Sequence, residues 1–205
     1  MKKVAIKLVW TAVFAMAGAL LFNACASAPK EEIAATRTAV ASAQTEDART
    51  YAPEAVQDAE ETLNKALAEV ETQDKKFALS RDYKGASDLL KQAKDKAAKA
   101  QEEAVAKKAK AKADAETAVA SLTPLLEDAK KALATAPKGK DTRADLEAMQ
   151  SDLKSAEEAA TEASTANSQG KYLDALAKAD SAKTKAGAIV EQVNQAKEKM
   201  KGKHK

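Results

Sequence analysis

The chain has 205 residues, with 34 Lys or Arg and 31 Asp or Glu, so its formal net charge is +3. Three of the basic residues, Lys2, Lys3 and Lys7, lie before residue 25, and the first acidic residue is Glu31, so the chain from residue 25 onward has a net charge of zero. Because proteins that bind nucleic acids present a basic face, we expect no nucleic acid as a partner.

The composition from residue 25 onward favours helices. Alanine, lysine, glutamate and leucine dominate, and the only aromatic residues are Tyr51, Phe77, Tyr83 and Tyr172. Residues that favour a sheet are sparse, whereas this mixture is typical of long helices and coiled coils. The expected fold class is all-α, with elongated antiparallel helical hairpins, or a coiled-coil bundle, sharing one long central helix.

Residues 1–24 have the features of a signal peptide for export. The positive start is followed by an apolar run from Leu8 to Phe22, interrupted only by Thr11. As a helix this run spans roughly 22 Å, less than the roughly 30 Å of a bilayer core, so we expect a removed signal rather than a membrane span. The run ends close to Cys25, the only cysteine, and we predict that Cys25 receives lipid and that residues 25–30 form a short tether.

The segment Leu21-Phe22-Asn23-Ala24-Cys25 resembles the lipobox of bacterial lipoproteins, although Phe22 stands where that family usually has leucine. The resemblance implies cleavage before Cys25, diacylglycerol on its sulfur and a fatty acid such as palmitate on its new amino group. Because Ala26 rather than Asp follows the cysteine, it also implies the outer membrane, facing the periplasm. Ala24 and Ala26 form a rival A-x-A site, whose cleavage would release a soluble protein.

The first predicted domain, residues 31–136, begins with two helices. The first is expected from Lys30 to about Ala48. Pro53 suits the first turn of the second helix, which is expected to run to about Ala78. The apolar seam of this second helix recurs every seven residues, at Val56, Leu63, Val70 and Phe77.

A turn at residues 80–82, with Ser80 or Asp82 as the cap, leads to a third and longest helix over residues 82–136. A seven-residue apolar repeat predicts that it supercoils with another helix. This repeat consists of Tyr83, Leu90, Ala97, Ala104, Ala111, Ala118, Leu125 and Ala132. Pro124 is expected to kink this helix; alternatively, with Thr123 as cap, it starts a new one.

A loop at residues 137–141 separates this part from a helical hairpin at residues 142–200 and a basic tail at 201–205. Asp141 or Thr142 is expected to cap a helix that ends near Ser168, and Gln169-Gly170 forms the corner before the last helix. The pattern around Tyr83, with Ala86, Ala93 and Ala97, recurs 89 residues later around Tyr172, which indicates an internal repeat.

Two corners carry a family resemblance. Tyr51-Ala52-Pro53-Glu54, followed by a helix and by Arg81-Asp82-Tyr83-x-x-Ala86, resembles a bacterial lipoprotein family with an alanine-rich helical domain of unknown function. The resemblance covers about Ile33 to Ala104 and implies an envelope lipoprotein built of helical hairpins, without implying any activity. A more generic similarity, through lipid, alanine heptads and a terminal Lys205, links the chain to the major outer-membrane lipoprotein that is attached to peptidoglycan.

The residues do not suggest an enzyme. His204 is the only histidine, the glycines are scattered, and the carboxylates alternate with lysines, so we expect no catalytic residue, cofactor or metal. Tyr83 and Tyr172 are expected to plug hairpin ends, with their hydroxyl groups in water. The basic stretch Lys107, Lys108, Lys110 and Lys112 is interpreted as a solvated helix face; contact with an anionic polymer is the alternative.

The sequence is compatible with two functions. The first is a structural spacer or scaffold rod, anchored to the outer membrane through acylated Cys25, either alone or as a small homo-oligomer. The second is a periplasmic adaptor that binds another envelope protein or peptidoglycan. In that case, apolar residues outside the seams would form the contacts, and Leu67, Leu79 and Leu133 are the candidates.

Overall fold

A computed structural model describes residues 27–138 and 142–203, with side chains up to residue 200. Cys25, Asp141, His204 and Lys205 lie outside these ranges, as does the predicted signal. The fold is all-α as predicted, and the described residues contain no strand. None of the helices within these ranges has the length and apolar character needed to cross a bilayer.

The chain divides into two compact units, residues 1–105 and 106–205, called unit 1 and unit 2 below. The division falls inside the longest helix, α5 (Lys84–Ala134), and not at the loop of residues 137–141. The first part of α5 packs against the helices before it, and its second part packs against those after it. A single helix therefore supplies one member to each bundle.

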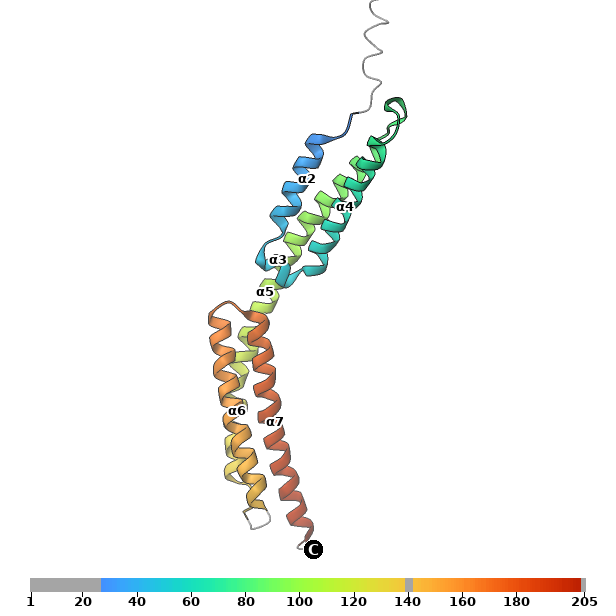
Figure 1. The fold of residues 1–205 in the computed structure, drawn as a ribbon. Coiled ribbons are helices and arrows are strands. Elements are labelled where there is room, and N and C mark those ends of the chain that lie inside the picture. The colour runs from blue at the N-terminus through green and yellow to red at the C-terminus, as the bar shows by residue number, and fades with distance from the viewer. Residues whose placement is uncertain (1–26, 139–141, 204–205) are drawn as a thin grey trace, which may run out of the picture. The chain divides into compact units, whose positions relative to one another are not determined.

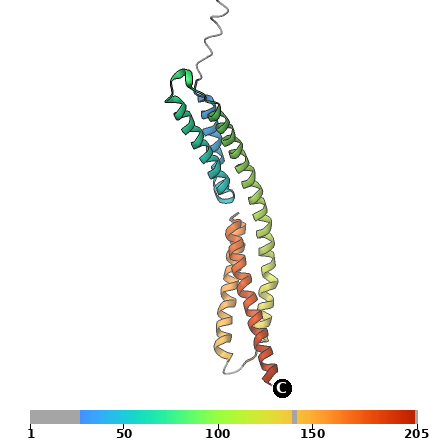
Figure 2. The same cartoon turned by 90° about the vertical axis from the view of Figure 1, so that its right-hand side faces the viewer.

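Unit 1 contains α2 (Lys30–Ala43), α3 (Glu46–Tyr51), α4 (Pro53–Asp74) and the first part of α5. In Figures 1 and 2, α2, α4 and this part of α5 run side by side. Leu63 packs against a buried cluster between them, consisting of Val40, Ala43, Ala59, Ala93 and Ala97. The small alanine side chains let the helix axes approach closely.

The first predicted helix is shorter than expected, because α2 ends at Ala43 and not near Ala48. The side chain of Thr45 accepts a hydrogen bond from the Ala48 amide and so starts the separate short helix α3. The corner that follows matches the prediction, since Pro53 occupies the first turn of α4. Tyr51 and Ala52 are buried beneath this corner.

The predicted end of the second helix was also wrong. α4 ends at Asp74, a turn and the short 3-10 helix η1 (Ala78–Ser80) follow, and Phe77 leaves the apolar seam with 73% of its surface exposed. The Arg81 guanidinium donates to the carbonyl oxygens of Asp74, at 2.8 Å, and Lys76, at 3.1 Å. These bonds satisfy carbonyls at the helix end that would otherwise lack partners, and so they favour ending the helix there.

Unit 2 contains the second part of α5, α6 (Arg143–Ser168) and α7 (Tyr172–Lys203), which lie side by side in both views. The helix α5 continues through Pro124, so Thr123 does not start a new helix. Beyond Ala111, the deeply buried α5 positions are Ala115, Leu122 and Ala129, and Ala136, just after the end of the helix, is buried as well. The predicted positions Ala118, Leu125 and Ala132 are only half-buried, because α6 and α7 pack against a slightly rotated face of the helix.

The corner between α6 and α7 is closed by backbone hydrogen bonds. The Lys171 amide donates to the Ala166 carbonyl and the Gly170 amide to the Asn167 carbonyl, which is the Schellman arrangement. Gly170 has φ 75°, a left-handed conformation that glycine adopts without steric cost. At the other end of α6, Thr142 stands at the cap position without a side-chain capping bond, and its hydroxyl donates to the Pro137 carbonyl.

The predicted repeat at an offset of 89 coincides with burial. Six seam positions of the first part of α5 and their α7 counterparts are all buried. The pairs are Ala86 and Ala175, Leu90 and Ala179, Ala93 and Ala182, Ala97 and Ala186, Ala100 and Ile189, and Ala104 and Val193. The last helix of each unit thus has the same buried seam. The helix before it is α4 in unit 1 and α6 in unit 2.

Candidate functional site

The first candidate region is the connection between α4 and α5, residues 75–83, which we call the tip loop. Besides the two bonds of Arg81, the Asp82 amide donates to the buried Gln73 side chain at 3.1 Å, and the Asp82 carboxylate accepts from the Lys84 amide at 2.9 Å. The hydroxyl of Tyr83 donates to the Asp74 carboxylate at 2.5 Å. Each residue of the Arg-Asp-Tyr corner therefore has a defined structural bond, and Asp82 contributes to the start of α5 as predicted.

Tyr83 differs from the prediction in one respect. Tyr83 is 6% exposed and packs beside Val70 and Ala86 at the seam. Its hydroxyl, however, donates a hydrogen bond to Asp74 and is not simply solvated. This hydrogen bond to a carboxylate raises the pKa of Tyr83 above its usual value, with partial burial adding to the effect. The tyrosine thereby ties the start of α5 to the end of α4.

The tip loop also presents apolar side chains to solvent. Phe77 is 73% exposed and Leu79 is 69% exposed. Ala28 and Ile33, at the start of the described chain, pack against the cluster of Val70, Tyr83 and Ala86. The start of α2 and the tip loop therefore lie at the same end of unit 1 (Figure 1).

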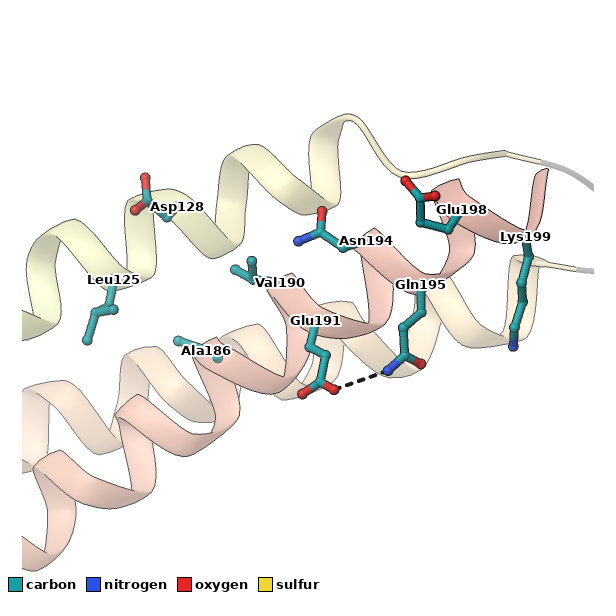
Figure 3. A pocket seen from close by; sticks show the side chains of 10 residues that line it. Leu125, Asp128, Ala186, Val190, Glu191, Asn194, Gln195, Glu198 and Lys199 are labelled. Carbon is teal, nitrogen blue, oxygen red and sulfur yellow. Dashed lines mark hydrogen bonds between the residues drawn. The ribbon is translucent and has the colours of Figure 1, made fainter. Parts of the chain in front are cut away.

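The second candidate region is a groove of about 750 Å³ in unit 2, between α5 and α7 (Figure 3). Leu125 and Asp128 line it from α5, and α7 supplies the other lining residues. Those include the small or apolar Ala186, Gly187 and Val190, and also Glu191 and Gln195, whose side chains are joined by a hydrogen bond of 3.1 Å. The arrangement suits an apolar segment, such as one face of a helix, better than a small polar substrate.

Gly187 is unexpected in the middle of a helix. A Cβ built at this position would meet no atom within 4 Å, so close packing within the chain does not require glycine. Glycine in a helix interior costs about 0.8–1 kcal/mol relative to alanine. The absent side chain instead keeps this part of the groove open.

The structure also places the basic stretch and the three leucines that the sequence singled out. Lys110 pairs with Asp114 at 2.5 Å and Lys112 with Glu116 at 3.9 Å on the same helix, which favours the solvated-face interpretation of the basic stretch. Of the three leucines named as contacts, only Leu79 is strongly exposed. Leu67 is half-buried and Leu133 packs against two interior clusters, so the expectation that these two side chains are exposed was wrong.

Part of the candidate surface was missed by sequence reasoning. Phe77 was assigned to the seam because its seven-residue spacing continues that of α4, and nothing in that spacing reveals where the helix ends. The groove beside Gly187 was also missed, and the isolated glycine inside a helical pattern was its only signal. In the part of the chain that the structure describes, no group of three or more His, Cys, Asp or Glu residues is placed to hold a metal ion.

The fold and its corners thus define a protein of alanine-seamed helical bundles. A family model described as a domain of unknown function, DUF4398, matches residues 31–116, which include both tyrosine corners and all of α4. No curated protein and no solved structure matches the chain.

Proposed function

We propose that the protein is a bacterial envelope lipoprotein without catalytic activity. Acyl groups on Cys25 would hold it in the periplasmic leaflet of the outer membrane, and its helical units would serve as a spacer or scaffold. The observation that carries the proposal is the proximity of the folded part to the predicted lipid site: Ala28 already packs against the cluster of unit 1. It follows Cys25 by only three residues.

The interiors of the two units support a structural role. Their seams consist mostly of fully buried alanines, and inter-helix ion pairs lie on the outside. Lys96 pairs with Asp58 at 2.7 Å in unit 1, and Lys130 with Glu157 at 2.9 Å in unit 2. Such interiors hold helices together without creating an enclosed cavity for a substrate.

Intact mass of the protein from the membrane fraction tests the anchor. The expected product begins at Cys25 and carries diacylglycerol and a fatty acid, and Cys25→Ser should appear unacylated in the soluble fraction. A wild-type product cut before Ser27, or an unmodified Cys25, would remove the anchor from the proposal. The spacer role is tested by scattering from the soluble Cys25→Ser protein, because a compact globule of this length would have a radius of gyration of about 16 Å. A value near that figure would argue against a spacer.

An adaptor that binds another envelope protein is the second candidate, and the groove in unit 2 favours it. Gly187→Leu should fill the groove, whereas Gly85→Leu offers a matched control, since its Cβ position is equally free of neighbours. Loss of a cross-linked envelope partner in the first variant alone would support the adaptor. Equal recovery of partners in both variants would count against it.

Binding to peptidoglycan is the remaining form of the adaptor. Co-sedimentation of the protein with purified peptidoglycan, with and without Lys205, tests it. A covalent link through the terminal lysine predicts a fraction that resists boiling in detergent and disappears when Lys205 is deleted.

A further inference from the structure

We propose that the tip loop is a second membrane contact, in which Phe77 and Leu79 insert into the lipid headgroup region beside the acylated Cys25. The inference rests on the proposed lipid anchor and adds to it a protein surface that faces the bilayer. It assigns a function to two side chains that the packing of unit 1 does not use.

The exposure of these side chains is built into the loop. Residues on both sides of them are fixed: the Arg81 guanidinium binds two carbonyls, the Asp82 amide binds Gln73, and the Ser80 amide donates to the Phe77 carbonyl at 2.8 Å. A loop held in this way keeps Phe77 and Leu79 outside the core. Two large apolar residues exposed so close together on a surface point to a partner that shields them from water.

The second corner of the chain shows that reversal of direction does not need this loop. Between α6 and α7, residues 169–171 accomplish the same reversal with Gln, Gly and Lys. Between α4 and α5, residues 75–83 are used instead, and the added length includes both exposed apolar residues. The longer connection therefore supplies a surface that a turn alone does not require.

The position of Cys25 identifies a bilayer as the occupant. Ala28 follows Cys25 by three positions in the chain, a span of about 11 Å at full extension. Ala28 packs in the cluster that contains Tyr83, the last residue of the tip loop. An acyl chain on Cys25 would therefore bring the membrane surface to the same end of unit 1 as Phe77 and Leu79.

The charge of the tip loop suits a lipid headgroup region. The loop contains Lys75, Lys76 and Arg81 but a single carboxylate, that of Asp82, and Lys75 also pairs with Glu71 of α4 at 2.7 Å. Long basic side chains at a membrane surface place their alkyl stems against the apolar layer and their charges among the phosphates. Aromatic and aliphatic side chains flanked by basic residues are the usual composition of segments that lie in this interface.

The depth of the loop in a bilayer can be measured with one tryptophan. Trp10 is the only tryptophan and lies in the predicted signal, so Leu79→Trp introduces a single reporter into the processed chain. The processed variant, without residues 1–24, is isolated from bacterial membranes and placed in vesicles of phosphatidylethanolamine and phosphatidylglycerol containing lipid brominated close to the headgroup. Thr50→Trp is the control, because Thr50 is exposed in α3, beyond the opposite end of the 22-residue helix α4, which is about 33 Å long.

The inference predicts that the Leu79→Trp variant emits at shorter wavelength than the Thr50→Trp control and is quenched by the brominated lipid, while the control is not. Adding Phe77→Asp to the Leu79→Trp variant should reduce the quenching, with unchanged helicity by circular dichroism. Emission of the Leu79→Trp variant that stays water-like in an acylated, vesicle-bound protein would overturn the membrane contact and leave the anchor standing. Equal quenching of the Thr50→Trp control would also overturn the membrane contact, because the bilayer would then not bind the tip loop in preference to other parts of unit 1.

The intact mass of the same sample separates this result from the anchor. If Cys25 proves unmodified, the proposed anchor fails, and the vesicle measurement still decides the tip loop. Quenching that is selective for the Leu79→Trp variant in the unacylated protein would support insertion by the loop alone, and its absence would overturn the inference.

Discussion

Replacing Leu90 tests the packing of unit 1 most directly. Leu90 is 1% exposed and is among the three largest fully buried side chains, of which the other two, Ile189 and Val193, belong to unit 2. Truncation to alanine removes buried carbon atoms and leaves a cavity at a fully buried position. Leu→Ala changes at such sites cost about 2.7–5 kcal/mol, and we expect about 3 kcal/mol here.

The assay is urea unfolding of the soluble Cys25→Ser protein, followed by circular dichroism. Amide hydrogen exchange in α2 and α4 localises the loss to unit 1. Leu79→Ala is the matched control, because the same atoms are removed from a side chain that is 69% exposed, and its effect should stay within about 0.5 kcal/mol. Phe77→Ala should be similarly mild, whereas a seam position would cost about 3–5 kcal/mol. The described packing of unit 1 would be refuted if Leu90→Ala lowered the free energy of unfolding no more than Leu79→Ala does, or if Phe77→Ala lowered it by several kcal/mol.

Three further predictions concern the seam, the corners and pH. Ala93→Leu at a fully buried position should destabilise unit 1 by about 1–3 kcal/mol in the same unfolding assay. The control Ala98→Leu, on the exposed face of the same helix, should be nearly neutral. Equal effects of the two substitutions would contradict the close approach of the helices. Gly170→Ala should lower the free energy of unfolding by about 1–2 kcal/mol because of the left-handed φ of Gly170, whereas Gly187→Ala should raise it by about 0.5–1 kcal/mol. A lower free energy of unfolding in both variants would show that Gly187 is needed for packing. Because the pKa of Tyr83 is raised in the folded state, its hydrogen bond contributes stability below pH 10 that is lost as the pH rises through the folded-state pKa. In alkaline unfolding titrations, wild type should therefore lose more stability than Tyr83→Phe. Parallel curves for the two proteins would exclude the bond to the carboxylate.

Much of the helical organisation could be predicted from the seven-residue spacing and the corner residues. Pro53 starts α4 and Gln169-Gly170 closes α6, because both act through local backbone geometry. The predicted end of α4 failed because the bonds that favour it involve Arg81 and Asp82, which follow the helix and fold back onto it. Spacing alone cannot register such a contact, so Phe77 was placed in the seam. The lipid site at Cys25 remains a prediction from the sequence.

What the sequence determined by itself is the all-α fold class and the register of most seams, since alanine spacing and turn residues act over a few neighbouring positions. Tertiary structure decided which stretches of α5 belong to which bundle. It also decided which face is buried beyond Ala111, and that Phe77 and Leu79 stay outside the core. The physical reason is that burial depends on which helix packs opposite, and that partner comes from a distant part of the chain.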